Sequence, residues 1–472
     1  MENNSGIREI INDLKRQIQE ELKELGRIAQ EQQVIRNREE LEKYEQEVAR
    51  HTDGLAGLMV GLKLQESIAS ERITEQSKQL VKSAAKRMKN QGVREVEVKV
   101  ARGATVRVKS EYYSGKSDGR KKRGRGIYPA LVLLGIYEGC TPSLAQEISA
   151  MAVLLGSFEE ASQVLLNRGI KIDVKTVRAI SYRTAQRARL WQQSEQFKLG
   201  ENLTLAGRRV IISSDGGRIR IRKTKRGQKT KKGRNRYSTY WREPKVMIIY
   251  TVTEKGEMDR SYAPFIDGTL KGPDMLFGLL VYYLSELNIC SADKIVFIAD
   301  GAPWIWKRLP KLFKSLGLNK DQVFEVIDFY HAVEHLGKVA ALRKSWNSSE
   351  RKRWVKHQRK LLLKGKVPEV IAAIDELCRG RSGKAITRER NYFFNNINRL
   401  NYAQLSALAL PIGSGAVESA IRRVINLRIK GPGIFWLREN AEAILMMRSF
   451  YKAGRWNLFN KMAFSPSLPI AA

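Results

Sequence analysis

Three short apolar segments of this chain each end in an aspartate. Asp215 follows "VIISS", Asp300 follows "KIVFIA" and Asp328 follows "FEVI". An acid directly after a buried strand is held on rigid backbone, at the edge where open α/β sheets place their ligands. A single strand-ending aspartate is more often a turn or cap residue, but three in one sheet predict a functional site.

A fourth acid, Glu418, lies in the segment "LPIGSGAVESAIRRVINLRIKGPGIFW", in the first turn of a predicted helix. Alone, Glu418 and Arg422 would form an ordinary surface ion pair one helical turn apart. With Asp215 and Asp300, Glu418 could instead form a carboxylate cluster, which would take up protons unless divalent cations neutralised it. Oxygen ligands suit Mg²⁺ or Mn²⁺ rather than zinc. Two such ions about 4 Å apart can activate an attacking oxygen and stabilise the leaving oxygen in phosphodiester cleavage.

The charge of the chain indicates the partner. Lys and Arg number 85 against 49 Asp and Glu, which gives a formal net charge of +36. DNA or RNA neutralises such an excess most economically, although a ribosome-associated or simply soluble basic protein is an alternative. Residues 218–236, between the first two strands, are expected to form a flexible loop that clamps phosphates beside the acids. The basic residues assigned to this clamp are Arg220, Arg222, Lys225 and Arg226.

The stretch "EVIDFYHAVEHL" suggests a different chemistry, because His331, Glu334 and His335 spell the H-x-x-E-H motif of inverted zinc proteases. Helical spacing allows both histidines on one face, and Glu350 or Glu369 could supply a further ligand. This metallopeptidase interpretation explains neither the positive charge nor the strand-ending acids. It therefore remains an alternative.

Composition argues against several other classes of protein. Cys140, Cys290 and Cys378 are far apart and form no C-x-x-C pair, which argues against a disulfide framework and a cysteine zinc knuckle. The N-terminus lacks the pattern of a secretory signal. The most apolar windows, "YPALVLLGIY" and "MLFGLLVYYL", are too short to span a bilayer. We expect a cytoplasmic protein without a membrane partner or a small-molecule substrate.

The elements that position the acids follow two helical regions. Residues 1–90 have apolar side chains three and four positions apart, which predicts helices in either a dimerising coiled coil or an internal two-helix hairpin. Alternation in "VEVKVARGATVRV" predicts a β-hairpin, and the basic, Gly-rich stretch 114–126 predicts a linker. Residues 91–126 would therefore be a hairpin with a linker.

Residues 127–200 are expected to be helical, and their last two helices resemble a helix-turn-helix with Gly169 in the turn. Plain helical packing is the alternative. The helices would begin at N-caps Ser143, Ser157 and Asp173. The last helix would present four basic side chains to a DNA groove: Lys175, Arg178, Arg183 and Arg187.

The second half of the chain changes to short β-branched runs bounded by turn residues. The predicted order of three strands, helix, strand, helix and strand indicates a mixed α/β sheet covered by helices. Residues 201–330 would form the first part of this core, and residues 331–408 a helical insertion. Residues 409–472 would return to the core as helices that carry Glu418.

Five segments resemble bacterial insertion-sequence transposases of the ISKra group, which are related to Mutator-like transposases. The segments are "SSDGGRIRIR", "YWREPKV", "ADGAPWIW", "DFYHAVEH" and "GSGAVESAIRRVINLRIKGPGIFW". The resemblance covers residues 130–455 approximately. It implies an α/β, ribonuclease H-like mixed sheet with an all-helical insertion, preceded by the helical and helix-turn-helix regions.

The resemblance also implies roles. Asp215, Asp300 and Glu418 would hold two Mg²⁺ or Mn²⁺ ions for nicking at the element's ends and for attack of the freed 3′-hydroxyl on target DNA. Asp328 and His331 match an Asp-x-x-His accessory pair that would organise the site or grip DNA. Phosphates near the third acid would be contacted by Arg422, Arg428 and Lys430. The partner would be double-stranded DNA, both the terminal inverted repeats and the target. The protein would act as a homo-oligomer and would be associated with the nucleoid when it binds this DNA.

Two alternatives share these residues: a structure-specific nuclease on the same fold, and an element-derived DNA-binding protein that no longer cuts. Trp304 and Trp306, just after Asp300, could stack on unpaired bases. Aromatic residues at this spacing in a helix are more often part of a core.

Overall fold

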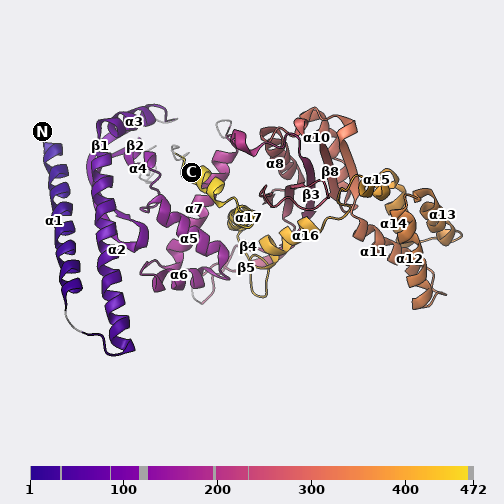
Figure 1. Cartoon of the computed structure of the whole chain (residues 1–472), viewed down its shortest axis with the longest axis horizontal. Helices are drawn as coiled ribbons and strands as arrows, with labels where there is room; N and C mark the ends of the chain where they lie inside the picture. The colour runs from indigo at the N-terminus through magenta and orange to yellow at the C-terminus, as the bar shows by residue number, and fades with distance from the viewer. Residues whose placement is uncertain are drawn as a thin grey trace. The chain divides into compact units, whose positions relative to one another are not determined.

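The computed structural model describes residues 2–31, 34–84, 87–115, 126–194, 198–231 and 233–465. The chain forms two compact units: residues 1–194 with 459–472, and residues 195–458 (Figure 1). We expected residues 409–472 to stay together, but the division falls within α18 (Trp456–Ala463). Most of the predicted basic linker, residues 116–125, lies outside the described residues.

The first unit begins with two long helices, α1 (Glu2–Gln30) and α2 (Arg38–Ile68), which pack side by side (Figure 1). Nδ1 of His51 lies 2.7 Å from Oε2 of Glu21 and links the two helices. Of the two arrangements left open by the sequence, the structure therefore has the internal helical hairpin. Helix α3 (Glu71–Lys82) follows.

The predicted β-hairpin is confirmed as β1 (Met88–Lys99) and β2 (Thr105–Gly115), with Val96 opposite Val108. The 3₁₀ helix η1 (Ala101–Gly103) forms its turn. The hairpin packs against α2 because Gly61 has no side chain: a Cβ there would lie 2.9 Å from Cβ of Val106.

Helices α4 (Pro129–Leu133), α5 (Pro142–Leu154), α6 (Phe158–Asn167) and α7 (Val174–Gln192) follow. The predicted caps at Ser157 and Asp173 are confirmed, since their side chains accept hydrogen bonds from backbone N–H groups of the first turn. The prediction for Ser143 is wrong: α5 begins at Pro142, a residue suited to the first helical turn, so Thr141 takes the cap position.

The second unit contains a mixed five-stranded sheet in the order β7-β6-β3-β8-β9. Its strands are β3 (Arg209–Gly216), β6 (Lys245–Val252), β7 (Phe265–Thr269), β8 (Lys294–Ala299) and β9 (Val323–Ile327). β6 is antiparallel to both of its neighbours, β3 and β7, whereas β8 and β9 run parallel to β3. The predicted mixed α/β sheet is thus confirmed.

Helices surround this sheet in the second unit. Those between the strands are α8 (Pro273–Glu286), α9 (Pro303–Trp306) and α10 (Leu309–Leu316), with η3 (Ile289–Ser291) and η4 (Lys320–Gln322) as short 3₁₀ turns. A further 3₁₀ turn, η2 (Glu201–Leu203), precedes β3. Helix α17 (Arg438–Lys452) packs against β7. All eight residues of β6 are buried, as expected for a strand covered on both faces.

The basic stretch between β3 and β6 is not simply a flexible loop. β4 (Ile219–Thr224) and β5 (Tyr237–Arg242) pair antiparallel as a separate two-stranded ribbon. The expectation of a loop over residues 218–236 is therefore wrong for the β4 portion. Ile219 and Ile221 supply the alternating buried side that a strand requires, although basic residues surround them.

Between β9 and residue 408 the chain is helical. The helices are α11 (Phe329–Ala341), α12 (Ser348–Leu363), α13 (Val367–Cys378), α14 (Lys384–Phe394), η5 (Ile397–Arg399) and α15 (Tyr402–Ala407). Helix α16 (Gly415–Ile421) then continues into the π-helical turn η6 (Arg422–Asn426). None of the described helices combines the length and apolar character needed to cross a bilayer.

Candidate functional site

The three strand-ending aspartates stand in one row. Paired positions on β3 and β8 differ by 85 (298 − 213), and those on β8 and β9 by 28 (327 − 299). If these offsets continue past the last paired residues, Asp215 lies opposite Asp300, and Asp300 lies opposite Asp328. The backbone N–H of Asp328 donates to the carbonyl of Ala299 at 2.8 Å, which extends the ladder one step further. Adjacent strands are about 4.8 Å apart, so the row crosses the carboxyl ends of three neighbouring strands.

Asp328 is fully buried and holds two segments together. Its Oδ1 accepts a hydrogen bond from the backbone N–H of His331 at 2.7 Å and lies 3.2 Å from Nδ1 of the same residue. Its Oδ2 accepts from the backbone N–H of Ser414, at the start of α16. Burial opposes ionisation, but the hydrogen bonds from His331 and Ser414 outweigh it and lower the pKa of Asp328 to about 2.

The imidazole of His331 responds to the same contact. The Asp328 carboxylate raises the pKa of His331 to about 9 against the opposing effect of burial, and the charges of Asp300 and Glu334 add to the rise. At neutral pH the pair is therefore an aspartate and an imidazolium.

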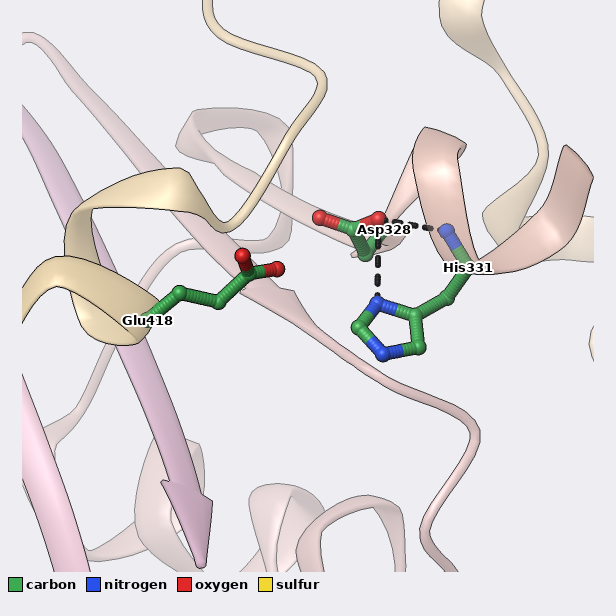
Figure 2. A group of neighbouring side chains, drawn as sticks. All are labelled: Asp328, His331 and Glu418. Carbon is green, nitrogen blue, oxygen red and sulfur yellow. Dashed lines mark hydrogen bonds and ion pairs between the residues drawn. The ribbon is translucent and has the colours of Figure 1, made fainter. Parts of the chain in front are cut away.

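Glu418 completes a group of three ligand-type side chains with this pair. It projects from the first turn of α16 toward Asp328 and His331 (Figure 2). One ligand atom from each of the three lies within 4.8 Å of the others. The Ser414 carbonyl accepts the backbone N–H of Glu418, so the hydrogen bond from Ser414 to Asp328 also positions Glu418. Carboxylates and imidazoles are common metal ligands, but an imidazolium has no lone pair for a metal, so Asp328 and Glu418 are the ligands of this group at neutral pH.

Asp215 has the opposite electrostatic surroundings. Burial raises its pKa, and the charges of Asp300 and Glu243 raise it further, although the Gly216 N–H, 2.5 Å from its Oδ1, works the other way. Carboxylates that repel one another in this way are stabilised in their charged form by a bound cation. The donor set thus fits a divalent metal.

The predicted set of three metal ligands is distributed differently in space. Glu418 was expected beside Asp215 and Asp300. In the described part of the chain, the group within 4.8 Å joins Glu418 to Asp328 and His331 instead. Asp215 and Asp300 lie further along the row of strand-ending aspartates and do not belong to this group of three. The accessory pair predicted from the resemblance is therefore central to the carboxylate arrangement.

His335 belongs to a different contact. Its Nδ1 lies 2.6 Å from Oε2 of Glu389, and its ring stacks on Tyr392 with the ring centres 3.7 Å apart. His331 faces Asp328, so the two histidines do not converge on one ligand among the described residues. The H-x-x-E-H motif does not form a zinc site.

Tyr392 is a residue of the site that the sequence did not indicate. It comes from α14, yet a Cβ on Gly301, directly after Asp300, would lie 2.3 Å from its Cε2. Burial, with the nearby charges of Asp300 and Asp328, raises the pKa of the Tyr392 hydroxyl. That hydroxyl has no hydrogen-bond partner in the described structure. The only sequence signal was the glycine after Asp300, which permits this close approach.

Glu243 was missed in the same way, although it lies in the quoted segment "YWREPKV". Its carboxylate occupies the space that a Cβ on Gly216 would need, and it lies 2.6 Å from Nζ of Lys245. Lys245 is buried, and its Nζ is 4.2 Å from the centre of the Trp304 ring. A charged pair, Glu243 and Lys245, thus lies beside Asp215.

Of the two alternatives for Trp306, base stacking and a place in the core, the structure has the core position that is more common at this spacing. Trp306 is buried, and its Nε1 donates to the carbonyl of Asp300 at 2.7 Å. This bond holds the backbone at the end of β8. Trp304 is partly buried, with Lys245 over its ring and Phe277 at its edge.

Three of the four basic residues predicted on α7, Lys175, Arg178 and Arg183, are exposed. Arg183 lies 3.9 Å from Glu138. The prediction for Arg187 is wrong. Its guanidinium lies 2.8 Å from Glu138 and 4.1 Å from the centre of the Tyr137 ring, so it is packed inside the unit.

The other predicted DNA contacts divide similarly. Arg220 and Arg222 are partly exposed on β4. Four further residues of this set are exposed to solvent: Lys225, Arg226, Arg422 and Lys430. Arg428 contradicts the prediction, because it is only 4% exposed and lies over the ring of Trp436 at 5.3 Å. The π-helical turn η6 precedes Arg428 and changes the direction of the side chains that follow it.

Comparison with models of known protein families gives no match, and no curated protein is a significant match to the sequence.

Proposed function

We propose that this protein is a metal-dependent DNA transposase with a ribonuclease H-like core. The observation that carries the proposal is the row of Asp215, Asp300 and Asp328, with Glu418 facing its end from α16. The first acid ends the first strand of the sheet, the second ends the fourth, and the last acid lies on a helix after an all-helical segment. This order agrees with the arrangement implied by the transposase resemblance.

The carboxylates would hold two divalent ions, Mg²⁺ or Mn²⁺, which when bound activate an attacking oxygen and stabilise the leaving one. Asp300 ends the middle strand of the row, so it can share ions with either neighbour. His331, an imidazolium at neutral pH, can donate to a phosphate oxygen of the strand to be cut. The Asp328 carboxylate keeps that imidazolium in place.

The net charge of +36 supports DNA as the substrate. Arg220, Arg222 and the exposed basic residues that follow them extend from the end of β3, next to Asp215. Strand cleavage would be followed by attack of the freed 3′-hydroxyl on target DNA. We expect the active form to be a homo-oligomer that pairs two element ends.

The experiment is cleavage of DNA that carries the element's terminal repeats, with Mg²⁺, with Mn²⁺ or with EDTA. Asp300→Ala should lower metal-dependent nicking by at least a hundredfold, because a ligand for the ions is lost. Asp293→Ala is the matched control, since Asp293 precedes the opposite end of the same strand. Equal nicking by wild type and Asp300→Ala would contradict the catalytic assignment.

Added target DNA separates the remaining possibilities. Joined products support a transposase, whereas cutting without joining indicates a structure-specific nuclease on the same fold. Specific binding of the repeats without metal-dependent cutting indicates an element-derived DNA-binding protein.

A further inference from the structure

The ribbon β4–β5 exposes two aromatic rings among arginines. Trp241 is 49% exposed and Tyr237 43%. The guanidinium of Arg218 lies 4.8 Å from the centre of the Trp241 ring, and that of Arg222 lies 6.0 Å from the centre of the Tyr237 ring. Large exposed aromatic rings on a rigid strand indicate a binding surface.

The ribbon has two different faces. Ile219 and Ile221 are buried, and Ile221 pairs with the buried Trp436. Arg220 and Arg222 alternate with these isoleucines, so they lie on the opposite face. Arg220 is directly opposite Trp241 in the ribbon, so the two share this outer face, and their groups lie 5.7 Å apart.

Tyr240 provides an internal comparison. It is 43% exposed, the same fraction as Tyr237, but it pairs with Ile221 and so belongs to the other face. Exposure alone therefore does not distinguish the outer face from the other face. The outer face is distinguished by the arginines that lie over the Trp241 and Tyr237 rings.

The position of the ribbon is fixed relative to the acidic row. β4 begins four residues after Asp215 (219 − 215), and the Gly217 N–H donates to the Pro244 carbonyl at 2.9 Å across the base of the ribbon. The Arg220 guanidinium donates to the Gly431 carbonyl at 2.9 Å, which ties β4 to the segment after η6. A strand bound along the ribbon would therefore lead toward Asp215.

The charge of the ribbon indicates which kind of ligand it can bind. Residues 218–242 include twelve Lys and Arg and no Asp or Glu. The occupant must be strongly anionic and must offer flat aromatic faces to the rings. Unpaired nucleotides meet both requirements, whereas a duplex hides the faces of its bases.

We propose that the outer face of the ribbon binds single-stranded DNA. Bases stack on Trp241 and Tyr237, and Arg218, Arg220 and Arg222 hold the phosphates. The inference rests on the proposed function, because nicking at the acidic row releases a strand end near the base of the ribbon.

The test measures binding of a fluorescent oligo(dT) of about 20 nucleotides by anisotropy, with the full chain in EDTA. Trp241→Ala should weaken binding about tenfold, and Trp241→Phe should retain most of the affinity. Tyr240→Ala should stay within about twofold of wild type, since its ring is on the other face. Equal losses in Trp241→Ala and Tyr240→Ala would overturn the proposal.

Two further arms identify the nucleic acid. Trp241→Ala should change the affinity for a duplex of the same length by less than about twofold, because stacking needs unpaired bases. An equal loss on duplex and oligo(dT), or tighter wild-type binding of oligo(U) than of oligo(dT), would overturn the assignment to single-stranded DNA. Photocrosslinking of iododeoxyuridine-substituted oligo(dT) to the wild-type protein should label Trp241 or Tyr237, a result that requires no variant to fold.

The assay without metal keeps the two proposals separate. If wild type binds oligo(dT) through Trp241 but does not nick DNA with Mg²⁺ or Mn²⁺, the transposase proposal fails and the binding surface stands. If Asp300 is required for nicking but Trp241→Ala binds normally, the binding surface fails alone.

Discussion

Asp328 and Asp215 end strands of the same sheet, but their surroundings shift their pKa values in opposite directions. Hydrogen bonds from His331 and Ser414 lower the pKa of Asp328 in spite of burial. At Asp215, burial and the charge of Asp300 raise the pKa. Hydrogen bonds thus favour the ionised form of Asp328, whereas burial and a neighbouring carboxylate disfavour the ionised form of Asp215.

The Asp328–His331 pair predicts a pH dependence of stability in the metal-free protein. The folded state raises the pKa of His331 from 6.5 to about 9, so its contribution is full below 6.5 and is lost as the pH rises through about 9. The pKa of Asp328 falls from 3.8 to about 2, so its contribution persists down to acid pH. In EDTA, His331→Gln should therefore be less stable than wild type at about pH 6, by on the order of 1 kcal/mol for a partly exposed imidazole. The difference should vanish near pH 10 in thermal melts.

The control for this prediction is His357→Gln. His357 is exposed on α12 and outside the site. Its variant should melt like wild type at both pH values. A constant difference between His331→Gln and wild type across this range would show that loss of packing, and not of charge, explains the effect.

At the scale of elements, the helical insertion reaches the acidic row through the side chain of Tyr392. Tyr392 of α14 packs over Gly301, directly after Asp300, and its ring also stacks on His335. The insertion thus packs against the segment that follows Asp300. Its helices are not merely spacing between β9 and α16.

We predict that Gly301→Ala destabilises the second unit by about 1–3 kcal/mol, because the new Cβ would overlap Tyr392. Tyr392→Ala should also destabilise it through loss of packing, but adding Gly301→Ala to that variant should cost little more. Urea denaturation of the four proteins gives the coupling energy. Strictly additive costs would mean that Gly301 and Tyr392 do not contact each other.

At the scale of the whole molecule, the first unit contains segments from both ends of the sequence, and the second unit lies between them in sequence. The ring of Phe464 packs against the core that includes Leu144, Ile148 and Leu165. The Tyr137 hydroxyl donates to the Ser465 carbonyl at 3.1 Å. The first unit is therefore discontinuous in sequence.

This arrangement predicts that Phe464→Ala destabilises only the first unit, by about 1–2 kcal/mol for a partly buried ring. Hydrogen–deuterium exchange should show faster exchange in α5, α6 and α7 but unchanged protection in β3 and β8. Leu190→Ala is the control, because Leu190 is exposed on α7. Loss of protection in both units would contradict a boundary at Leu458.

The residues mispredicted as DNA contacts share a physical cause. Arg187 and Arg428 occur in basic helical sequences, which on average face solvent. Glu138 and the Tyr137 ring hold Arg187 inside the first unit, and the π-helical turn places Arg428 over Trp436. A partner distant in sequence outweighs the local pattern in both cases.

The sequence by itself determined the β1–β2 hairpin, the caps at Ser157 and Asp173, and the three strands that end near Asp215, Asp300 and Asp328. These features depend on residues within one or two turns of each other, so local patterns encode them. Only the tertiary structure decided that Glu418 faces Asp328 and His331 and that Tyr392 lies on Gly301. These contacts depend on the register of strands far apart in sequence and on a hydrogen bond that joins α16 to the end of β9. No local pattern determines either of them.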